Sequence, residues 1–90
     1  MNKNLNEFYK ETINCLILYG EMDEADAHKL ADSSKIFETE DETDANIIFH
    51  EYPYYWAMVL LHPDNPQWHQ DPNLWPPPKD YLDKALNKNL

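Results

Sequence analysis

Glycine, cysteine and long apolar runs are all scarce in this chain of 90 residues. The single glycine leaves few positions for hairpin turns that need positive φ angles, which argues against a β-rich fold. The single cysteine, Cys15, excludes an internal disulfide, and its apolar neighbours predict a buried free thiol. No signal peptide and no run of membrane-spanning length is recognisable, so we expect a cytoplasmic protein that does not bind membranes.

Positive charge is also scarce, and the negative charge is unevenly distributed. The net charge is −10, and residues 20–51 contain eleven of the 17 acids but only Lys29 and Lys35. Such a field repels nucleic acid and anionic lipid and attracts basic partners. The composition therefore argues against direct nucleic-acid binding and favours a protein partner with a basic surface.

The first third of the chain predicts two helices. Residues 4–19 place apolar side chains on one side at 100° per residue and charged side chains opposite, and Gly20 is expected to follow as the C′ residue. Residues 24–34 follow Asp23, a residue type that caps helices well. Acids in the first turn of this second helix favour the positive end of the helix dipole.

Two further helices are predicted over residues 43–50 and 79–88. The former begins among carboxylates, and we expect Ile47, together with Ile48 or Phe49, to point inward. The latter places tyrosine, leucine and alanine side chains on one face. Both are short, which suits a domain with one modest core.

Residues 54–61 are apolar around the whole circumference of a helix that Pro53 can begin. A helix of this kind must be covered on all sides. The next segment, residues 63–78, contains six prolines together with Trp68 and Trp75. We interpret it as an extended, proline-stiffened strap that lays its aromatic rings against the preceding helix.

These elements predict a single all-α domain over residues 1–90. The expected architecture is a compact bundle of four to five short helices with the Pro/Trp-rich strap packed on it. The core residues that the pattern predicts are Leu16, Leu30, Ile47, Met58 and Leu61.

The residue types do not favour catalysis or metal binding. His50, His62 and His69 belong to separate predicted elements and match no zinc-binding pattern. The apolar neighbours of Cys15 should raise rather than lower its pKa. One glycine supplies no phosphate-cradling loop. We expect no enzyme activity, no cofactor and no metal; a metal-dependent or hydrolytic enzyme that uses the three histidines is the alternative.

The strongest surface feature is the acidic segment, residues 38–44 (ETEDETD), which is followed by a run of tyrosines. The segment is either a solvated helix start or a docking patch for a basic protein, and the tyrosines are either core residues or interface anchors. We expect at least one tyrosine to reach the surface beside the acids. The predicted partner-binding residues are Glu38, Glu40, Asp41, Glu42, Asp44, Glu51, Tyr52, Tyr54 and Tyr55.

The sequence of residues 50–58, HEYPYYWAM, resembles a His-Glu-x-Pro-Tyr-Tyr-Trp-Ala-Met signature in small bacterial proteins. Some of these proteins resemble immunity proteins, which neutralise a toxin made by the same cell or its neighbours. The resemblance extends at most over residues 20–62 and assigns no catalytic or binding residue. It implies a toxin-neutralising role, and immunity proteins to nucleases are often acidic because their targets have basic clefts.

We therefore expect an acidic protein-binding module, an immunity protein that occludes a basic toxin surface. Two alternatives stay open within the same class. One is a phage-type DNA mimic that blocks a DNA-binding protein, which requires carboxylates spaced like phosphates over a long surface. The other is a regulatory adaptor whose tyrosine face binds a peptide.

Overall fold

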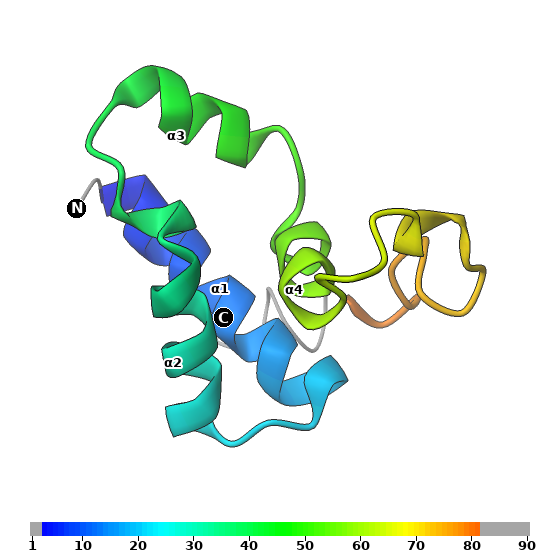
Figure 1. Cartoon of the computed structure of the whole chain (residues 1–90). Helices are drawn as coiled ribbons and strands as arrows, with labels where there is room; N and C mark the ends of the chain where they lie inside the picture. Colours follow the sequence, from blue (N-terminus) through cyan, green and yellow to red (C-terminus); the bar gives the residue numbers. More distant parts are fainter. Residues whose placement is uncertain (1–2, 82–90) are drawn as a thin grey trace.

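Helices account for all the regular secondary structure that the computed structural model contains between residues 3 and 81, the residues it describes (Figure 1). The predicted all-α class is therefore confirmed for this part of the chain. The predicted helix over residues 79–88 lies almost entirely outside it. The elements are α1 (Lys3–Gly20), α2 (Glu24–Ser34), the 3-10 helix η1 (Ile36–Glu38), α3 (Glu42–Phe49), α4 (Pro53–Leu61) and the 3-10 helix η2 (Trp68–Gln70).

Helix α1 lies against both α2 and α4, and α1 and α4 contribute the two largest groups of core side chains (Figure 1). The predicted apolar face is confirmed for Leu5 and Leu16, which are fully buried. The expectation that Gly20 lies outside the helix as its C′ residue is wrong. Gly20 is helical, and Glu21 adopts the left-handed conformation instead, with φ of 56°.

The glycine at the end of α1 permits a close approach between α1 and α4. A Cβ atom at Gly20 would lie 2.8 Å from Cδ2 of Leu61, well inside van der Waals contact. The leucine side chain therefore occupies the space that any other residue would need. A larger residue at position 20 would therefore require the Leu61 side chain to move.

Helix α2 begins as predicted, because the Asp23 carboxylate accepts a 2.7 Å hydrogen bond from the Asp26 backbone N–H. Its inner face is narrow: Ala27 and Ala31 are buried, whereas Leu30, a predicted core residue, is only partly buried. Small side chains allow the helix to lie close to α1. None of the helices between residues 3 and 81 combines the length and apolarity that crossing a bilayer requires.

Helix α3 stands apart from the other helices (Figure 1) and differs from the prediction in one respect. Ile47, expected in the core, has 58% of its surface exposed. The inner face consists instead of Ala45 and Ile48, which are buried, and Phe49, which is half-buried. These three residues follow the i, i+3, i+4 spacing of one helical face, and Ile47 lies 100° away from Ile48. The ring of Phe49 packs 5.6 Å from that of Phe8 on α1.

Helix α4 begins at Pro53 as predicted and is covered on several sides. Besides α1, the strap (residues 63–78) packs on it, with the buried Trp68 ring 5.2 Å from that of Tyr55. The predicted packing of the strap is thus confirmed, but the prediction that it is extended is wrong. The strap folds through successive turns and η2, because its backbone closes local hydrogen bonds such as that from the Trp75 N–H to the Asp71 carbonyl (3.0 Å).

Tyr81 ties the N-terminus of α4 to α1. Its buried hydroxyl accepts a 3.1 Å hydrogen bond from the backbone N–H of Tyr54, which is too near the helix start to have an intrahelical partner. The same hydroxyl is hydrogen-bonded to Cys15. The thiol is fully buried, as predicted, and burial raises its pKa to about 12. One hydroxyl thus serves two buried groups.

Replacing this hydroxyl should destabilise the protein measurably. In Tyr81→Phe, the buried N–H of Tyr54 loses its acceptor, and an unsatisfied buried donor costs about 1–3 kcal/mol. Urea unfolding followed by far-ultraviolet circular dichroism measures this loss. The control is Tyr52→Phe, whose ring is 59% exposed and which should change stability by less than about 0.5 kcal/mol. Equal losses in the two variants would contradict the role of Tyr81.

Candidate functional site

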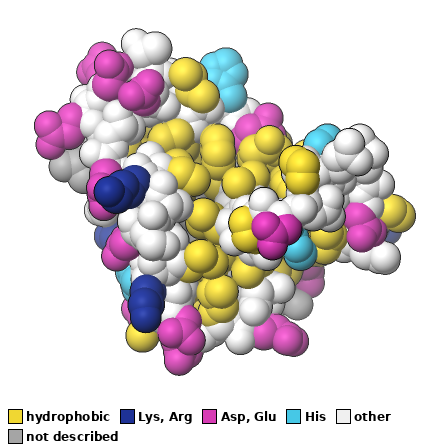
Figure 2. All heavy atoms as spheres, viewed as in Figure 1, with side chains coloured by type: hydrophobic (Ala, Val, Ile, Leu, Met, Phe, Trp, Pro, Cys, Tyr) yellow, Lys and Arg dark blue, Asp and Glu magenta, His cyan; other side chains and the backbone are white. Residues whose placement is uncertain are grey.

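The acidic segment forms the connection from η1 into the first turn of α3, and all five of its carboxylate side chains are exposed. Figure 2 shows acidic side chains gathered at the upper left of the face, where α3 begins. Apolar side chains occupy the middle of the same face, between α2, α3 and α4. The predicted acidic residues therefore border an apolar surface rather than a uniformly polar one.

The aspartates of the acidic segment hold its backbone in place. Asp41 caps α3 by accepting a 2.7 Å hydrogen bond from the Thr43 N–H. Thr39 donates its hydroxyl proton to Asp44 (3.2 Å) and accepts from the Asp41 N–H (3.1 Å). These bonds fix the turn that precedes the helix, so the segment has a defined conformation despite its charge.

The glutamates of the segment have no such role. Among residues 3–81 the ion pairs are Lys10 with Glu7 (3.9 Å) and His28 with Glu24 (3.7 Å), and neither involves the acidic segment. Glu38, Glu40 and Glu42 are therefore exposed charges without a counter-charge in the described part of the chain. They are the groups through which the segment can meet a cationic surface.

This division between aspartates and glutamates can be tested by stability measurements. Asp41→Ala removes the N-cap of α3 and should lower the free energy of unfolding by about 0.5–2 kcal/mol. Glu40→Ala removes the same charge from the same exposed segment and should change it by less than about 0.5 kcal/mol. Urea unfolding of both variants measures the two losses. A loss of stability in Glu40→Ala as large as that in Asp41→Ala would contradict the division between aspartates and glutamates.

The three predicted tyrosines have different environments. Tyr52 is 59% exposed, and Tyr55 is half-buried against the strap. Tyr54 is only 3% exposed, and its hydroxyl donates to the Leu74 carbonyl at 2.5 Å. Because Tyr54 points into the core, it does not belong to the exposed face that the sequence analysis assigned to it. Ile47 is an exposed apolar side chain that the sequence pattern did not predict. It is exposed because its neighbours Ala45, Ile48 and Phe49 form the inner face of α3.

Glu51 and Tyr52 lie together in a cavity that the sequence did not predict. The cavity measures about 340 Å³ and lies beside the C-terminal end of α3. Its other lining residues are Phe49 and His50 from the same stretch and Trp75 from the strap. Trp75 could not be assigned to this site from the sequence, because only the folding of the strap brings residue 75 to this position.

The histidines do not form a metal site in the described residues. His50 lines the cavity beside α3, His62 follows the end of α4, and His69 lies in η2 with its ring edge-on to Trp68. No group of three or more histidine, cysteine, aspartate or glutamate side chains between residues 3 and 81 is arranged to hold a metal ion.

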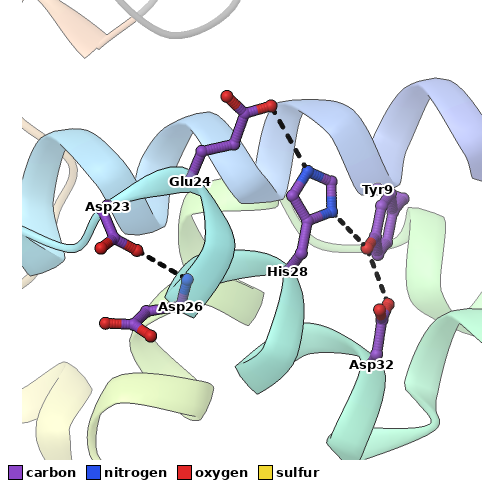
Figure 3. Close-up of polar contacts among 6 residues, drawn as sticks. All are labelled: Tyr9, Asp23, Glu24, Asp26, His28 and Asp32. Carbon is purple, nitrogen blue, oxygen red and sulfur yellow. Dashed lines mark hydrogen bonds and ion pairs between the residues drawn. The ribbon is translucent and has the colours of Figure 1, made fainter.

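The fourth histidine, His28, belongs to a polar chain that joins α2 to α1 (Figure 3). The Tyr9 hydroxyl donates to Asp32 (2.7 Å), and its oxygen lies 2.8 Å from Nδ1 of His28, whose Nε2 is 3.7 Å from Glu24. Burial raises the pKa of Tyr9 to about 12, and the hydrogen bond and charge of Asp32 act in the same direction. Because it connects side chains of α1 and α2, we interpret it as a structural link between these helices.

The Tyr9 link predicts a specific alkaline behaviour. The folded state favours the protonated hydroxyl, so its contribution to stability is fully present below pH 10 and is lost as the pH rises towards about 12. The unfolding free energy of the wild-type protein should fall more steeply across this interval than that of Tyr9→Phe. Urea unfolding at several pH values measures both slopes, and parallel curves would contradict the expectation.

Comparisons of the chain with protein-family models, with curated proteins and with solved structures found no match. A function for this chain must therefore be inferred from the geometry of its surface. Its elements are three exposed glutamates held on an ordered turn, an apolar surface beside them, and an aromatic cavity at the other end of the same helix.

Proposed function

We propose that this chain is a protein-binding domain that docks on a basic protein surface through α3 and the residues next to it. The single observation that carries the proposal is the set of exposed glutamates Glu38, Glu40 and Glu42, which have no counter-charge within residues 3–81. Carboxylates placed in this way accelerate encounter with a cationic partner and fix the orientation of the complex.

Apolar groups on the same helix supply the contact that charge alone does not. Ile47 and Tyr52 are two of the large side chains that remain mostly exposed, at 58% and 59%. Ile47 lies on α3, and Tyr52 lies in the connection that follows it. Interfaces commonly place aromatic and aliphatic anchors inside a charged rim, and the rim affects the association rate more than the final affinity.

An immunity-type inhibitor is the form of this function that fits best. An acidic domain that covers a basic active-site cleft blocks the cleft by occupying it, and no chemistry of its own is required. The resemblance of residues 50–58 to a signature of small bacterial proteins, some of them like immunity proteins, supports the same role. If the partner is a nuclease, the carboxylates take the place of substrate phosphates.

The test first isolates the partner and then measures its rate of association with the chain. Affinity capture at low salt, followed by elution with rising salt, supplies the partner, whose association rate with the chain is then measured. Neutralising the free glutamates in Glu38→Gln, Glu40→Gln and Glu42→Gln together should slow association about tenfold or more at low ionic strength and flatten its salt dependence. One equivalent of the wild-type chain should abolish the activity of the partner.

A matched control removes the same number of charges elsewhere. The exposed acids Glu21, Asp26 and Asp64 lie outside the acidic segment, and their amide substitutions together give the same net charge as the first triple variant. If only the overall charge mattered, the two triple variants would slow association equally. Equal association rates for the wild-type protein and the segment variant would remove the acidic segment from the binding site.

A further inference from the structure

Three aromatic residues line the cavity beside the end of α3, and the ring of each packs against another ring of the protein. Phe49 packs on Phe8, with ring centroids 5.6 Å apart, and Tyr52 packs edge-on to Tyr81 at 6.2 Å. The third wall, Trp75, is held 5.7 Å from Trp68 and also contacts Tyr54 and Tyr55. The walls come from α3, from the α3–α4 connection and from the strap, so a ligand would find the site already formed.

The chemistry of these walls selects a cation. The face of an aromatic ring carries negative potential and attracts positive groups that lie over it. The half-buried Glu51 adds a carboxylate, and none of the lysines among the described residues lines the cavity. A volume of about 340 Å³ is at the lower end of the range for small-ligand pockets, about 300–1,000 Å³. It suits the end of one side chain rather than a whole cofactor.

We propose that this cavity receives the guanidinium group of an arginine side chain on the partner protein. The inference rests on the proposed function, since it names the group that anchors the basic partner. A planar guanidinium stacks on aromatic rings and pairs with a carboxylate through two parallel hydrogen bonds. Tyr52 and Trp75 are the aromatic residues of the lining, and Glu51 is its carboxylate residue. A lysine ammonium, which is compact and strongly hydrated, would use only part of this arrangement.

The position of the cavity relative to the acidic segment supports a two-point contact. The segment precedes and begins α3, whereas the cavity lies at the other end of this helix, which spans Glu42–Phe49. Ile47 is exposed between them. A partner surface that lies along α3 would therefore place basic groups on the glutamates and insert one arginine at the far end.

The inference can be tested without the partner. Binding of Nα-acetyl-L-argininamide to the purified full chain is followed by nuclear magnetic resonance through the indole N–H signal of Trp75, which Trp75→Phe identifies. The measurement is made near pH 8. The matched probe is Nα-acetyl-L-citrullinamide, which has the same shape without the charge. We expect the argininamide to bind about tenfold tighter or more.

Two variants locate the binding. Tyr52→Leu removes one ring from an exposed position and should weaken argininamide binding about fivefold or more, and Glu51→Gln should weaken it while leaving the protein spectrum otherwise unchanged. Equal binding of the arginine and citrulline probes, or argininamide binding that Tyr52→Leu leaves intact, would overturn the site. Equal binding of Nα-acetyl-L-lysinamide would overturn the choice of arginine.

The same variants separate this inference from the proposed function. The triple glutamine variant of the acidic segment leaves the cavity unchanged and should bind argininamide as the wild-type protein does. If that variant associates with the partner at the wild-type rate while argininamide still binds, the proposed function fails alone. If the variant slows association but argininamide does not bind, the cavity inference fails alone.

Discussion

The structure depends on one constraint, which is that α4 is apolar on every side and must be covered by the rest of a short chain. Helix α1 packs along it so closely that a side chain at Gly20 would meet Leu61. The strap covers another side with Trp68. The hydroxyl of Tyr81 accepts the hydrogen bond of the Tyr54 backbone N–H at the start of the helix. Pro53, Tyr54, Ala57, Met58 and Leu60 of α4 are buried in this way, and the other apolar side chains of the helix are half-buried.

The exposed position of α3 follows from this covering of α4. Helix α3 reaches the core through the buried Ile48 and the half-buried Phe49, and the indole N–H of Trp56 on α4 donates to the Ile48 carbonyl (2.8 Å). Its first turn, rich in carboxylates, could not be buried against an apolar helix without a large desolvation cost. The charged end of α3 therefore faces solvent, and Ile47 is exposed beside it. The surface that we propose as the docking face is the part of the chain that covering α4 leaves unused.

Much of the fold could be predicted because its signals are local. The periodicity of residues 4–19, the N-cap at Asp23 and the proline that begins α4 each depend on a few neighbouring residues, and each is found in the structure. The tryptophans of the strap also indicated packing correctly, since rings of that size are rarely left in solvent.

The features that the sequence did not predict have a common cause, because each of them depends on contacts between segments of the chain. Adjacent isoleucines in α3 gave no local reason to choose Ile48 over Ile47 until the ring of Phe49 fixed the inner face. Tyr54 was assigned to the surface with its neighbours, but the strap covers it and bonds its hydroxyl. The cavity was not predictable at all, because one of its walls, Trp75, is placed by the turns of the strap.

The unequal roles of the two acidic residue types in the segment bear on how such a protein can change over evolutionary time. Asp41 accepts a hydrogen bond from the backbone and Asp44 accepts one from the Thr39 hydroxyl, so their replacement affects folding. Glu38, Glu40 and Glu42 have no such commitment and can be exchanged at little cost in stability. Under the proposed function, the charge pattern of the docking face can therefore change over generations while the scaffold stays the same.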